Sequence, residues 1–378
     1  MPLILADENI PQIAEALAAA GEVRLAPGRA INRAMLADVD ALAVRSVTKV
    51  DPALLSGTPV RVVASATSGM DHVDVSGLRA AGVRVDSAEG SNAWSVVEYV
   101  VAALLEIEAS FGSTRGARLG VVGLGRIGGK VARVARSLGF DVRACDPPLA
   151  EAGHDDGAGG AFLPLGDLIA WADVATLHVP LTNGGRWPTR SMIDTEALSR
   201  ARRGLHFINA SRGEVVVEAS LRQALGSGAL RSATLDVWQD EPRIDSATLD
   251  AAFLATPHIA GYSFDGKLEG TRMVAQAISE ALGAPFDWRP TLEPADALPL
   301  AWDSGAADWT QLRRLVRGAY DIREDDAALR AAPADGFGAH FDSLRKRYRK
   351  RREFTAFVVR GASLPPFLDT LRFRTVPG

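Results

Sequence analysis

The chain has 378 residues, of which 47% are hydrophobic and 23% are charged, a composition typical of globular enzymes with two or three domains. Its formal net charge of −4 argues against non-specific nucleic-acid binding by the whole protein. The one cysteine excludes an internal disulfide, and the sequence has neither a signal-peptide core nor an apolar run of membrane-spanning length. We therefore expect a cytoplasmic protein without membrane partners.

Short apolar strands alternate with helical patterns along the first hundred residues. The strands are expected at 3–6, 41–44, 61–64 and 84–86, and the helices at 11–20, 75–81 and 93–110. This alternation predicts a parallel, doubly wound sheet of the α/β class.

A glycine-rich turn follows the next predicted strand, in the run Arg118-Leu-Gly-Val-Val-Gly-Leu-Gly-Arg-Ile-Gly128. Gly123 permits a tight turn, Gly125 lets the backbone approach a pyrophosphate, and Gly128 lets helix and strand pack closely. Asp146 ends the following strand and can accept hydrogen bonds from ribose hydroxyls, which favours NAD over NADP. The alternative is an ordinary glycine turn in a βαβ unit, but the surrounding strands and the spacing of Asp146 favour dinucleotide binding.

A second alternating unit continues from this turn. Its further strands are expected at 141–145, 174–178, 206–209 and 234–237, and its helices at 129–138, 195–200, 218–225 and 267–282. Ligands bind outside the carboxyl ends of strands in open α/β sheets. Arg212, Asp236 with Glu241, and His258 each follow or end such a strand, so we expect them to converge on one crevice.

The chemistry of these side chains is complementary. An arginine fork can hold a carboxylate through two hydrogen bonds, and a histidine can take a hydroxyl proton as a hydride leaves. A glutamate beside that imidazole orients it and favours its protonated form. Together with NAD, Arg212, Glu241 and His258 predict oxidation of a 2-hydroxy acid. Taken singly, they can equally be a surface arginine, a turn glutamate and a structural histidine.

The composition of the sequence changes near Pro285. Residues 285–308 are rich in Pro, Asp, Trp and Ala without a clear period, which predicts a linker or an irregular crossing. A helix is expected at 309–320 and a strand at 354–360. The basic run Arg345–Arg352 can bind nucleic acid or form a solvated helix face paired with acids such as Asp325 and Asp326. The acidic overall charge favours the second interpretation, so no nucleic-acid partner is expected.

The order of glycine loop, Arg212, Glu241 and His258 resembles the D-isomer-specific 2-hydroxyacid dehydrogenase family over residues 1 to about 285. The resemblance implies that Arg212 binds the substrate carboxylate, that His258 is the acid/base and that Glu241 orients it. It implies two doubly wound parallel-sheet (Rossmann/flavodoxin-like) domains. These two would be a substrate-binding lid domain (1–93 and 263–286) and an NAD-binding Rossmann domain (94–262). A C-terminal α+β dimerisation domain (287–378) would follow them.

A closer resemblance is to the branch of this family that oxidises 4-phospho-D-erythronate in pyridoxal 5′-phosphate biosynthesis. The stretches that carry it are 6–11, 44–50, 64–74, 258–267, 320–326 and 341–346. It implies substrate contacts from Ser46, Thr67, Arg212 and Tyr262, and a homodimer formed through the C-terminal part. The implied cofactor contacts are Gly123, Gly125, Arg126, Ile127, Gly128, Asp146, Thr176, Asp236 and Gly261. The departures are serines where the branch has cysteines, at Ser91 and Ser211.

Two other functions remain open at the level of sequence. One is a dehydrogenase for a different D-2-hydroxy acid, because the phosphorylated substrate follows from the resemblance and not from the residues themselves. The other is a non-catalytic NAD-sensing scaffold, which the joint presence of Arg212, Glu241 and His258 disfavours. No spacing of histidines, cysteines and carboxylates matches a metal centre, so no metal is expected.

Overall fold

The computed structural model describes residues 1–112, 116–292, 300–302, 308–333 and 335–377. The chain forms two compact units, Met1–Asn92 with Ser263–Glu293 and Ala93–Tyr262 with Pro294–Gly378. Each unit contains a parallel sheet flanked by helices, which confirms the predicted α/β class.

The first unit has a five-stranded parallel sheet in the order β2-β1-β3-β4-β5. Its strands are β1 (Leu3–Asp7), β2 (Glu22–Ala26), β3 (Ala41–Val44), β4 (Val62–Ser65) and β5 (Arg84–Ser87). Its helices are α1 (Ile13–Ala16), α2 (Pro52–Leu55), α3 (Val75–Ala80) and α11 (Phe264–Leu282), with 3₁₀ turns η1 (Gly28–Ala30) and η2 (Arg33–Leu36). Every residue of β1, β3 and β4 is buried, because helices or 3₁₀ turns cover both sheet faces.

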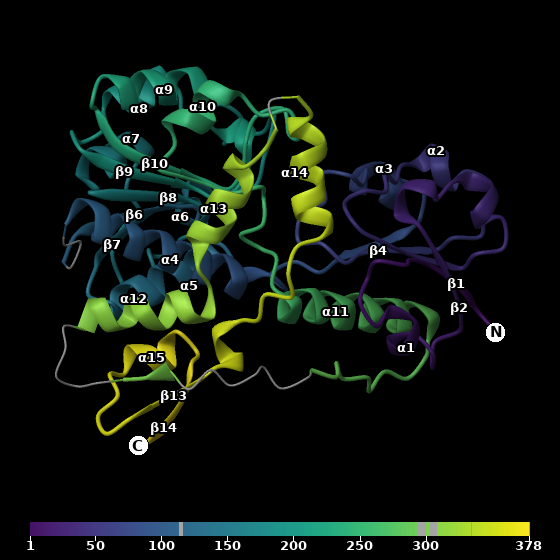
Figure 1. The fold of residues 1–378 in the computed structure, drawn as a ribbon. Helices are drawn as coiled ribbons and strands as arrows, with labels where there is room; N and C mark the ends of the chain where they lie inside the picture. Colours follow the sequence, from purple (N-terminus) through teal and green to yellow (C-terminus); the bar gives the residue numbers. More distant parts are fainter. Residues whose placement is uncertain (113–115, 293–299, 303–307, 334, 378) are drawn as a thin grey trace. The chain divides into compact units, whose positions relative to one another are not determined.

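The second unit is built on a six-stranded parallel sheet in the order β11-β10-β9-β8-β6-β7 (Figure 1). Its strands are β6 (Arg118–Val122), β7 (Asp141–Cys145), β8 (Val174–Leu177), β9 (Leu205–Asn209), β10 (Leu230–Leu235) and β11 (Leu254–Ala255). Helices α4 (Ala93–Phe111) and α5 (Gly128–Ser137) pack on one face. The other face is covered by α7 (Leu165–Trp171), α8 (Thr195–Ser199), α9 (Glu218–Gly226) and α10 (Ser246–Ala251). The short α6 (Pro147–Glu151) and η3 (Gly213–Val215) follow two strand ends.

The residues after Pro294 belong to this second unit, where they add a small α+β part. Its strands β12 (Leu300–Ala301), β13 (Val358–Gly361) and β14 (Arg374–Pro377) form a parallel sheet. Its helices are α12 (Asp308–Ala319), α13 (Ile322–Arg330), α14 (Phe337–Lys346) and α15 (Phe367–Thr370), with the turn η4 (Phe354–Ala356). Trp309, Leu312 and Phe354 share one hydrophobic core with α4 and α5. A separate dimerisation domain at 287–378 therefore stays a prediction.

Most predicted elements are present, with ends that differ by a few residues. The strands expected at 41–44 and 141–145 have those bounds. Of the strand expected at 354–360, the first residues form the turn η4, and only Val358–Gly361 is strand. The Phe354 N–H donates a hydrogen bond to the buried Glu98 carboxylate and so does not pair with a neighbouring strand. The helix expected at 11–20 is reduced to Ile13–Ala16, and residues 293–299 and 303–307 of the expected linker lie outside the described residues.

Candidate active site

The carboxyl-terminal edge of the six-stranded sheet collects the residues that the sequence singles out. All six strands are parallel, so the segments that follow them leave the same edge. These positions are Gly123 after β6, Asp146 after β7, Thr176 within β8, Arg212 after β9, Asp236 after β10 and His258 after β11. The structure thus brings the predicted cofactor and catalytic positions of this unit to one edge.

The glycine turn between β6 and α5 has the geometry of a phosphate cradle. Gly123 has φ of +86°, and a Cβ there would lie 2.8 Å from the His178 carbonyl oxygen. A Cβ at Gly128 would lie 1.9 Å from the Gly123 carbonyl oxygen, so this position requires glycine. A Cβ at Gly125 would instead meet nothing within 4 Å, which leaves the backbone open to a pyrophosphate at the N-terminus of α5. Arg126 is exposed and Ile127 is half-buried in the same turn.

Asp146 and Thr176 lie beside this turn. The Asp146 carboxylate accepts hydrogen bonds from the backbone N–H of Leu124, at 2.8 Å, and of Leu149, at 3.1 Å. It thereby ties the glycine turn to the end of β7, and each oxygen retains a lone pair for a ribose hydroxyl. The buried Thr176 hydroxyl pairs with His178 Nε2 at 3.0 Å. Burial lowers the pKa of His178 to about 3, so this imidazole is neutral, and its buried Nδ1 has no hydrogen-bond partner among the described residues.

His258 and Glu241 form a pair through His258 Nδ1 and Glu241 Oε2, which are 2.7 Å apart. The other carboxylate oxygen accepts from the Trp238 N–H at 3.0 Å, so both Glu241 oxygens have partners. Burial opposes ionisation of Glu241, but the His258 charge and hydrogen bond, with help from Arg345, outweigh burial and lower the pKa of this carboxyl. An ionised Glu241 therefore holds the proton on Nδ1 and leaves Nε2 to exchange a proton with a ligand.

Asp236 fixes the loop that carries His258. Its carboxylate is 1% exposed and accepts hydrogen bonds from the Thr256 hydroxyl and from the N–H groups of Ile259 and Ala260. The His258 N–H donates to the Asp236 carbonyl oxygen at 2.7 Å. Burial raises the pKa of Asp236 despite these contacts and the nearby His258. The structure shows Asp236 as an organiser of the loop, and its predicted cofactor contact, like that of half-buried Gly261 in the same loop, stays a prediction.

Arg212 lies in the turn between β9 and η3, where its Nη1 donates to the Ser211 carbonyl oxygen at 2.8 Å. The adjacent Gly213 contacts the segment that leads to Glu241, because a Cβ on Gly213 would lie 1.9 Å from the Trp238 carbonyl oxygen. The arginine loop and the glutamate loop are therefore packed directly together. Ser211, one of the departures from the family pattern, bonds Asn209 Oδ1 and so supports this turn.

Tyr262 ends the histidine loop and contacts two residues of the C-terminal part. Arg345 Nη2 of α14 donates to the Tyr262 hydroxyl at 3.2 Å, and the guanidinium carbon lies 5.8 Å from the ring centroid. The Tyr348 ring meets the Tyr262 ring edge-on at 5.9 Å. The sequence carries no signal for a role of Arg345, because this residue is only one member of the basic run Arg345–Arg352.

The first unit carries the remaining predicted substrate contacts at the corresponding edge of its own sheet. Ser46 follows β3 and is exposed, and Thr67 follows β4, where its hydroxyl contacts the Ser65 hydroxyl and the Gly69 carbonyl. Lys267, in the first turn of α11, is partly buried, and burial together with the Arg45 charge lowers its pKa to about 8. Two cations are thus held near each other within this unit.

The described residues contain no group of three or more histidine, cysteine, aspartate and glutamate residues that could hold a metal ion. Over the same residues, no helix combines the length and the apolar character needed to cross a membrane.

The sequence is similar to a family of dehydrogenases and to individual members of it. Residues 105–260 match the family model described as D-isomer specific 2-hydroxyacid dehydrogenase, NAD binding domain, and residues 292–370 match a domain of unknown function, DUF3410. The chain is 45% identical to an erythronate-4-phosphate dehydrogenase of Salinibacter ruber, over 96% of this chain and 95% of the relative. It is 44% identical to the enzyme of that name from Pseudomonas aeruginosa PAO1, over 94% of each chain.

Solved structures share the fold over about three quarters of the chain. A D-lactate dehydrogenase from Aquifex aeolicus, complexed with NAD and lactic acid, has a TM-score of 0.59 and 24% identity, covering 74% of this chain and 96% of its own. An NAD-dependent formate dehydrogenase from Staphylococcus aureus, in complex with NAD, has a TM-score of 0.61 and 20% identity, covering 76% and 97%. Since those chains are matched almost completely, this protein has a part that they lack.

Proposed function

The chain belongs to the erythronate-4-phosphate dehydrogenases, a group of NAD-dependent enzymes within the D-isomer-specific 2-hydroxyacid dehydrogenases, and from this premise we propose that it oxidises 4-phospho-D-erythronate to 3-hydroxy-2-oxo-4-phosphooxybutanoate. This reaction belongs to pyridoxal 5′-phosphate biosynthesis. The observation that carries the proposal is the 2.7 Å contact between His258 Nδ1 and Glu241 Oε2 at the sheet edge that also holds the glycine turn.

The cofactor site is proposed at the turn Gly123–Gly128. The open backbone at Gly125 and the N-terminus of α5 suit a pyrophosphate, while Asp146 offers carboxylate lone pairs to ribose hydroxyls and would repel a 2′-phosphate. Thr176, Asp236 and Gly261 are proposed as further contacts along the same edge. Bound NAD⁺ supplies the hydride acceptor.

Three side chains would carry out the remaining chemistry. Arg212 would hold the C1 carboxylate of the substrate through its guanidinium fork. Neutral His258 would take the C2 hydroxyl proton on Nε2 while the C2 hydride leaves, so that the alcohol carbon becomes a ketone. Glu241, ionised and bonded to Nδ1, would stabilise the imidazolium that forms. Positioning and proton transfer are the main contributions of the protein.

The substrate phosphate is proposed to bind in the first unit. Arg45 and Lys267 bring two positive charges close together, and both side chains can donate hydrogen bonds to phosphate oxygens. Ser46 and Thr67 add hydroxyl groups after β3 and β4 of the same unit. Tyr262 is proposed as a further substrate contact, and the C-terminal part as the contact surface of a homodimer.

A substrate panel tests the proposal. We expect the purified protein to reduce NAD⁺ with 4-phospho-D-erythronate at a kcat/KM far above that with D-lactate, D-glycerate, D-3-phosphoglycerate or unphosphorylated D-erythronate. Preference for another D-2-hydroxy acid would replace the substrate assignment. NAD⁺ binding without turnover of any of them would instead indicate a sensing role. Light scattering after size exclusion tests the homodimer separately.

A further inference from the structure

The loop that carries His258 is attached to the C-terminal part at three successive points. Asp326 of α13 accepts a hydrogen bond from the Ala255 N–H at 2.8 Å, just before the loop begins. Ala260 accepts a hydrogen bond from the Ser95 hydroxyl, and the Ser95 carbonyl accepts one from Arg351. The loop ends at Tyr262, which Arg345 contacts from α14. The C-terminal part thus fixes the start, the middle and the end of this loop.

The contact between Arg345 and Tyr262 has a defined direction. A guanidinium has only donors, so the Tyr262 hydroxyl oxygen is the acceptor, and its own proton must be directed to a different atom. The guanidinium over one face of the ring and the edge-on Tyr348 ring restrict the tyrosine ring. Arg345 also packs over Phe341, one helical turn earlier in α14, so its side chain is itself held in place.

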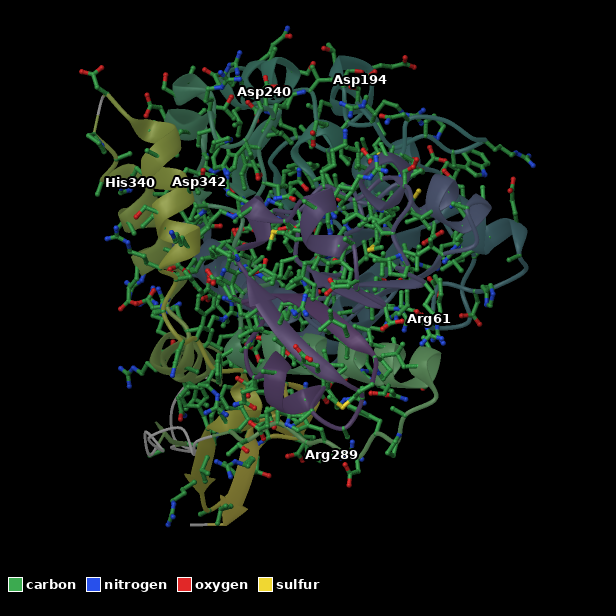
Figure 2. The ribbon with its side chains drawn as sticks, turned by 90° about the vertical axis from the view of Figure 1, so that its right-hand side faces the viewer. Arg61, Asp194, Asp240, Arg289, His340 and Asp342 are labelled. Atoms are coloured by element: carbon green, nitrogen blue, oxygen red, sulfur yellow. The ribbon has the colours of Figure 1, made fainter. Side chains whose placement is uncertain are left out.

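The charge of Arg345 lies among negative groups of the catalytic edge. Its charged form is favoured by Tyr262, Glu241 and Asp236 against the cost of burial, and in return it favours the ionised form of Glu241. The other titratable groups that face this cluster are His258, from the loop, and Tyr348, after α14. The N-terminal end of α14 is also close to the glutamate loop, because a Cβ on Gly338 would lie 3.5 Å from the Pro242 carbonyl oxygen. Figure 2 labels His340 and Asp342 on this same helix.

We propose that Arg345 is a positioning residue of the active site, which fixes the Tyr262 hydroxyl for hydrogen bonding to the substrate and balances the negative charge of Glu241. The C-terminal part is therefore a component of the catalytic machinery within one chain, besides any role in dimerisation. The inference rests on the proposed roles of Tyr262 and of the His258–Glu241 pair. The Nε–H of Arg345 is buried and has no hydrogen-bond partner among the described residues. The position of Arg345 therefore leaves one of its own donors unsatisfied.

Two substitutions separate charge from geometry. Arg345→Met removes both, and we expect KM for the hydroxy acid to rise about tenfold, the scale of one lost charge-assisted hydrogen bond. The acid limb of kcat/KM should move to higher pH, because losing a nearby positive charge makes the His258–Glu241 pair bind its proton more tightly. Arg345→Lys keeps the charge, so the acid limb should stay in place. The matched control is Lys346→Met, the exposed neighbour on α14, which should change neither quantity.

A double-mutant cycle tests the route through the tyrosine. In a Tyr262→Phe background, Arg345→Met should add little to the increase in KM, because the hydroxyl that it positions is already absent. Additive increases in KM, or equal losses in Arg345→Met and Arg345→Lys with an unmoved acid limb and a lowered melting temperature, would show a purely structural arginine and overturn the inference.

A measurement without turnover keeps this inference distinct from the proposed function. The carboxyl ¹³C resonance of Glu241, assigned with Glu241→Gln, should titrate at higher pH in Arg345→Met than in the wild type or in Lys346→Met. An unchanged titration rejects the charge effect of Arg345 whatever the substrate is. Failure to oxidise 4-phospho-D-erythronate, with the titration shifted as expected, rejects only the substrate assignment.

Discussion

His258 has a backbone φ of +56°, a left-handed conformation that is uncommon for residues with a Cβ. Its own N–H binds the Asp236 carbonyl, and the N–H groups of the next two residues bind the Asp236 carboxylate. Several contacts therefore enforce one unfavourable conformation, which is the pattern seen where a side chain must be aimed accurately.

Replacing this histidine tests its assignment as the base. We expect His258→Ala to lose turnover by roughly 10²–10⁴-fold, the usual contribution of a positioned base, while NADH binding, followed by fluorescence, stays close to wild type. Exposed His154 provides the control, since His154→Ala should leave turnover unchanged. Turnover at the wild-type rate in His258→Ala would reject the assignment.

Lys267 gives a second prediction at the level of single residues. Its pKa of about 8 means that it loses its charge as the pH rises through 8, so KM for a phosphorylated substrate should increase above that pH. Lys267→Arg should extend the range of low KM to higher pH, and Lys267→Met should raise KM at all pH values. Exposed Lys49 serves as the control through Lys49→Met. A KM that stays constant from pH 7 to 9.5 would place the phosphate elsewhere.

Residue identity and spacing were sufficient to predict that the candidate catalytic residues of the second unit lie at one edge of its sheet. Arg212, Glu241 and His258 follow strands that the sequence already marks, and parallel strands deliver such residues to one edge. Arg345 was beyond reach, because it is 83 residues from Tyr262 in the chain and only packing of α14 against the loop brings them together. The prediction of a solvated helix face for the basic run was wrong, because α14 ends at Lys346 and Arg351 is buried, although Arg349 pairs with Asp325 of α13 as the sequence suggested.

At the level of elements, two glycines of the glycine turn have different roles: Gly128 allows close packing, and Gly125 leaves space for the cofactor. Gly128→Ala should destabilise the second unit, because the new Cβ would collide with the Gly123 carbonyl. Gly125→Ala should leave the melting temperature unchanged, since its Cβ meets open space, but should weaken NAD⁺ binding by obstructing the pyrophosphate. Calorimetry and NADH titration of both variants measure these effects. Normal NAD⁺ affinity in Gly125→Ala would move the cofactor away from this turn.

Helices and strands were predictable where a periodic apolar segment is bounded by a glycine or an acidic residue. Strand β7 is bounded by Gly139-Phe140 and Asp146 and was predicted with its observed bounds. By contrast, β11 has only two residues, Leu254 and Ala255, and exists because it pairs with β10 and is bonded by Asp326. Helices α13 and α14 also escaped prediction, since charged residues dominate their exposed faces and their few apolar side chains pack on distant parts of the chain.

At the level of the whole molecule, a buried contact between Glu98 and Arg351 connects α4 to the C-terminal part. Glu98 is 2% exposed and accepts hydrogen bonds from Arg351 Nη2, at 3.2 Å, and from the Phe354 N–H, at 2.6 Å. Burial raises the pKa of Glu98 to about 8 despite the Arg351 charge. The folded protein therefore holds this proton more tightly than the unfolded chain does, so the group stabilises the fold at low pH and this contribution declines as the pH rises towards 8.

Thermal unfolding of Glu98→Gln tests this linkage. The difference in melting temperature between the wild type and the variant should decrease between pH 5 and pH 8, since in that interval only the wild type releases a proton from this side chain when it unfolds. Glu108→Gln, on the same helix and paired with Arg313 at a more exposed position, is the matched control and should give a constant difference. A constant difference for Glu98→Gln as well would show that Glu98 is ionised throughout this interval.

The reactivity of the single thiol, Cys145, can be used to measure local unfolding of the cofactor-binding sheet. Cys145 ends β7 next to Asp146, and burial raises the pKa of its thiol to about 12. Thiol-reactive reagents attack the thiolate, so labelling of the native protein requires this strand to separate from its neighbours. The labelling rate thus measures local unfolding at one defined place, and saturating NAD⁺ should slow it, because a ligand that binds only the closed sheet suppresses the open state.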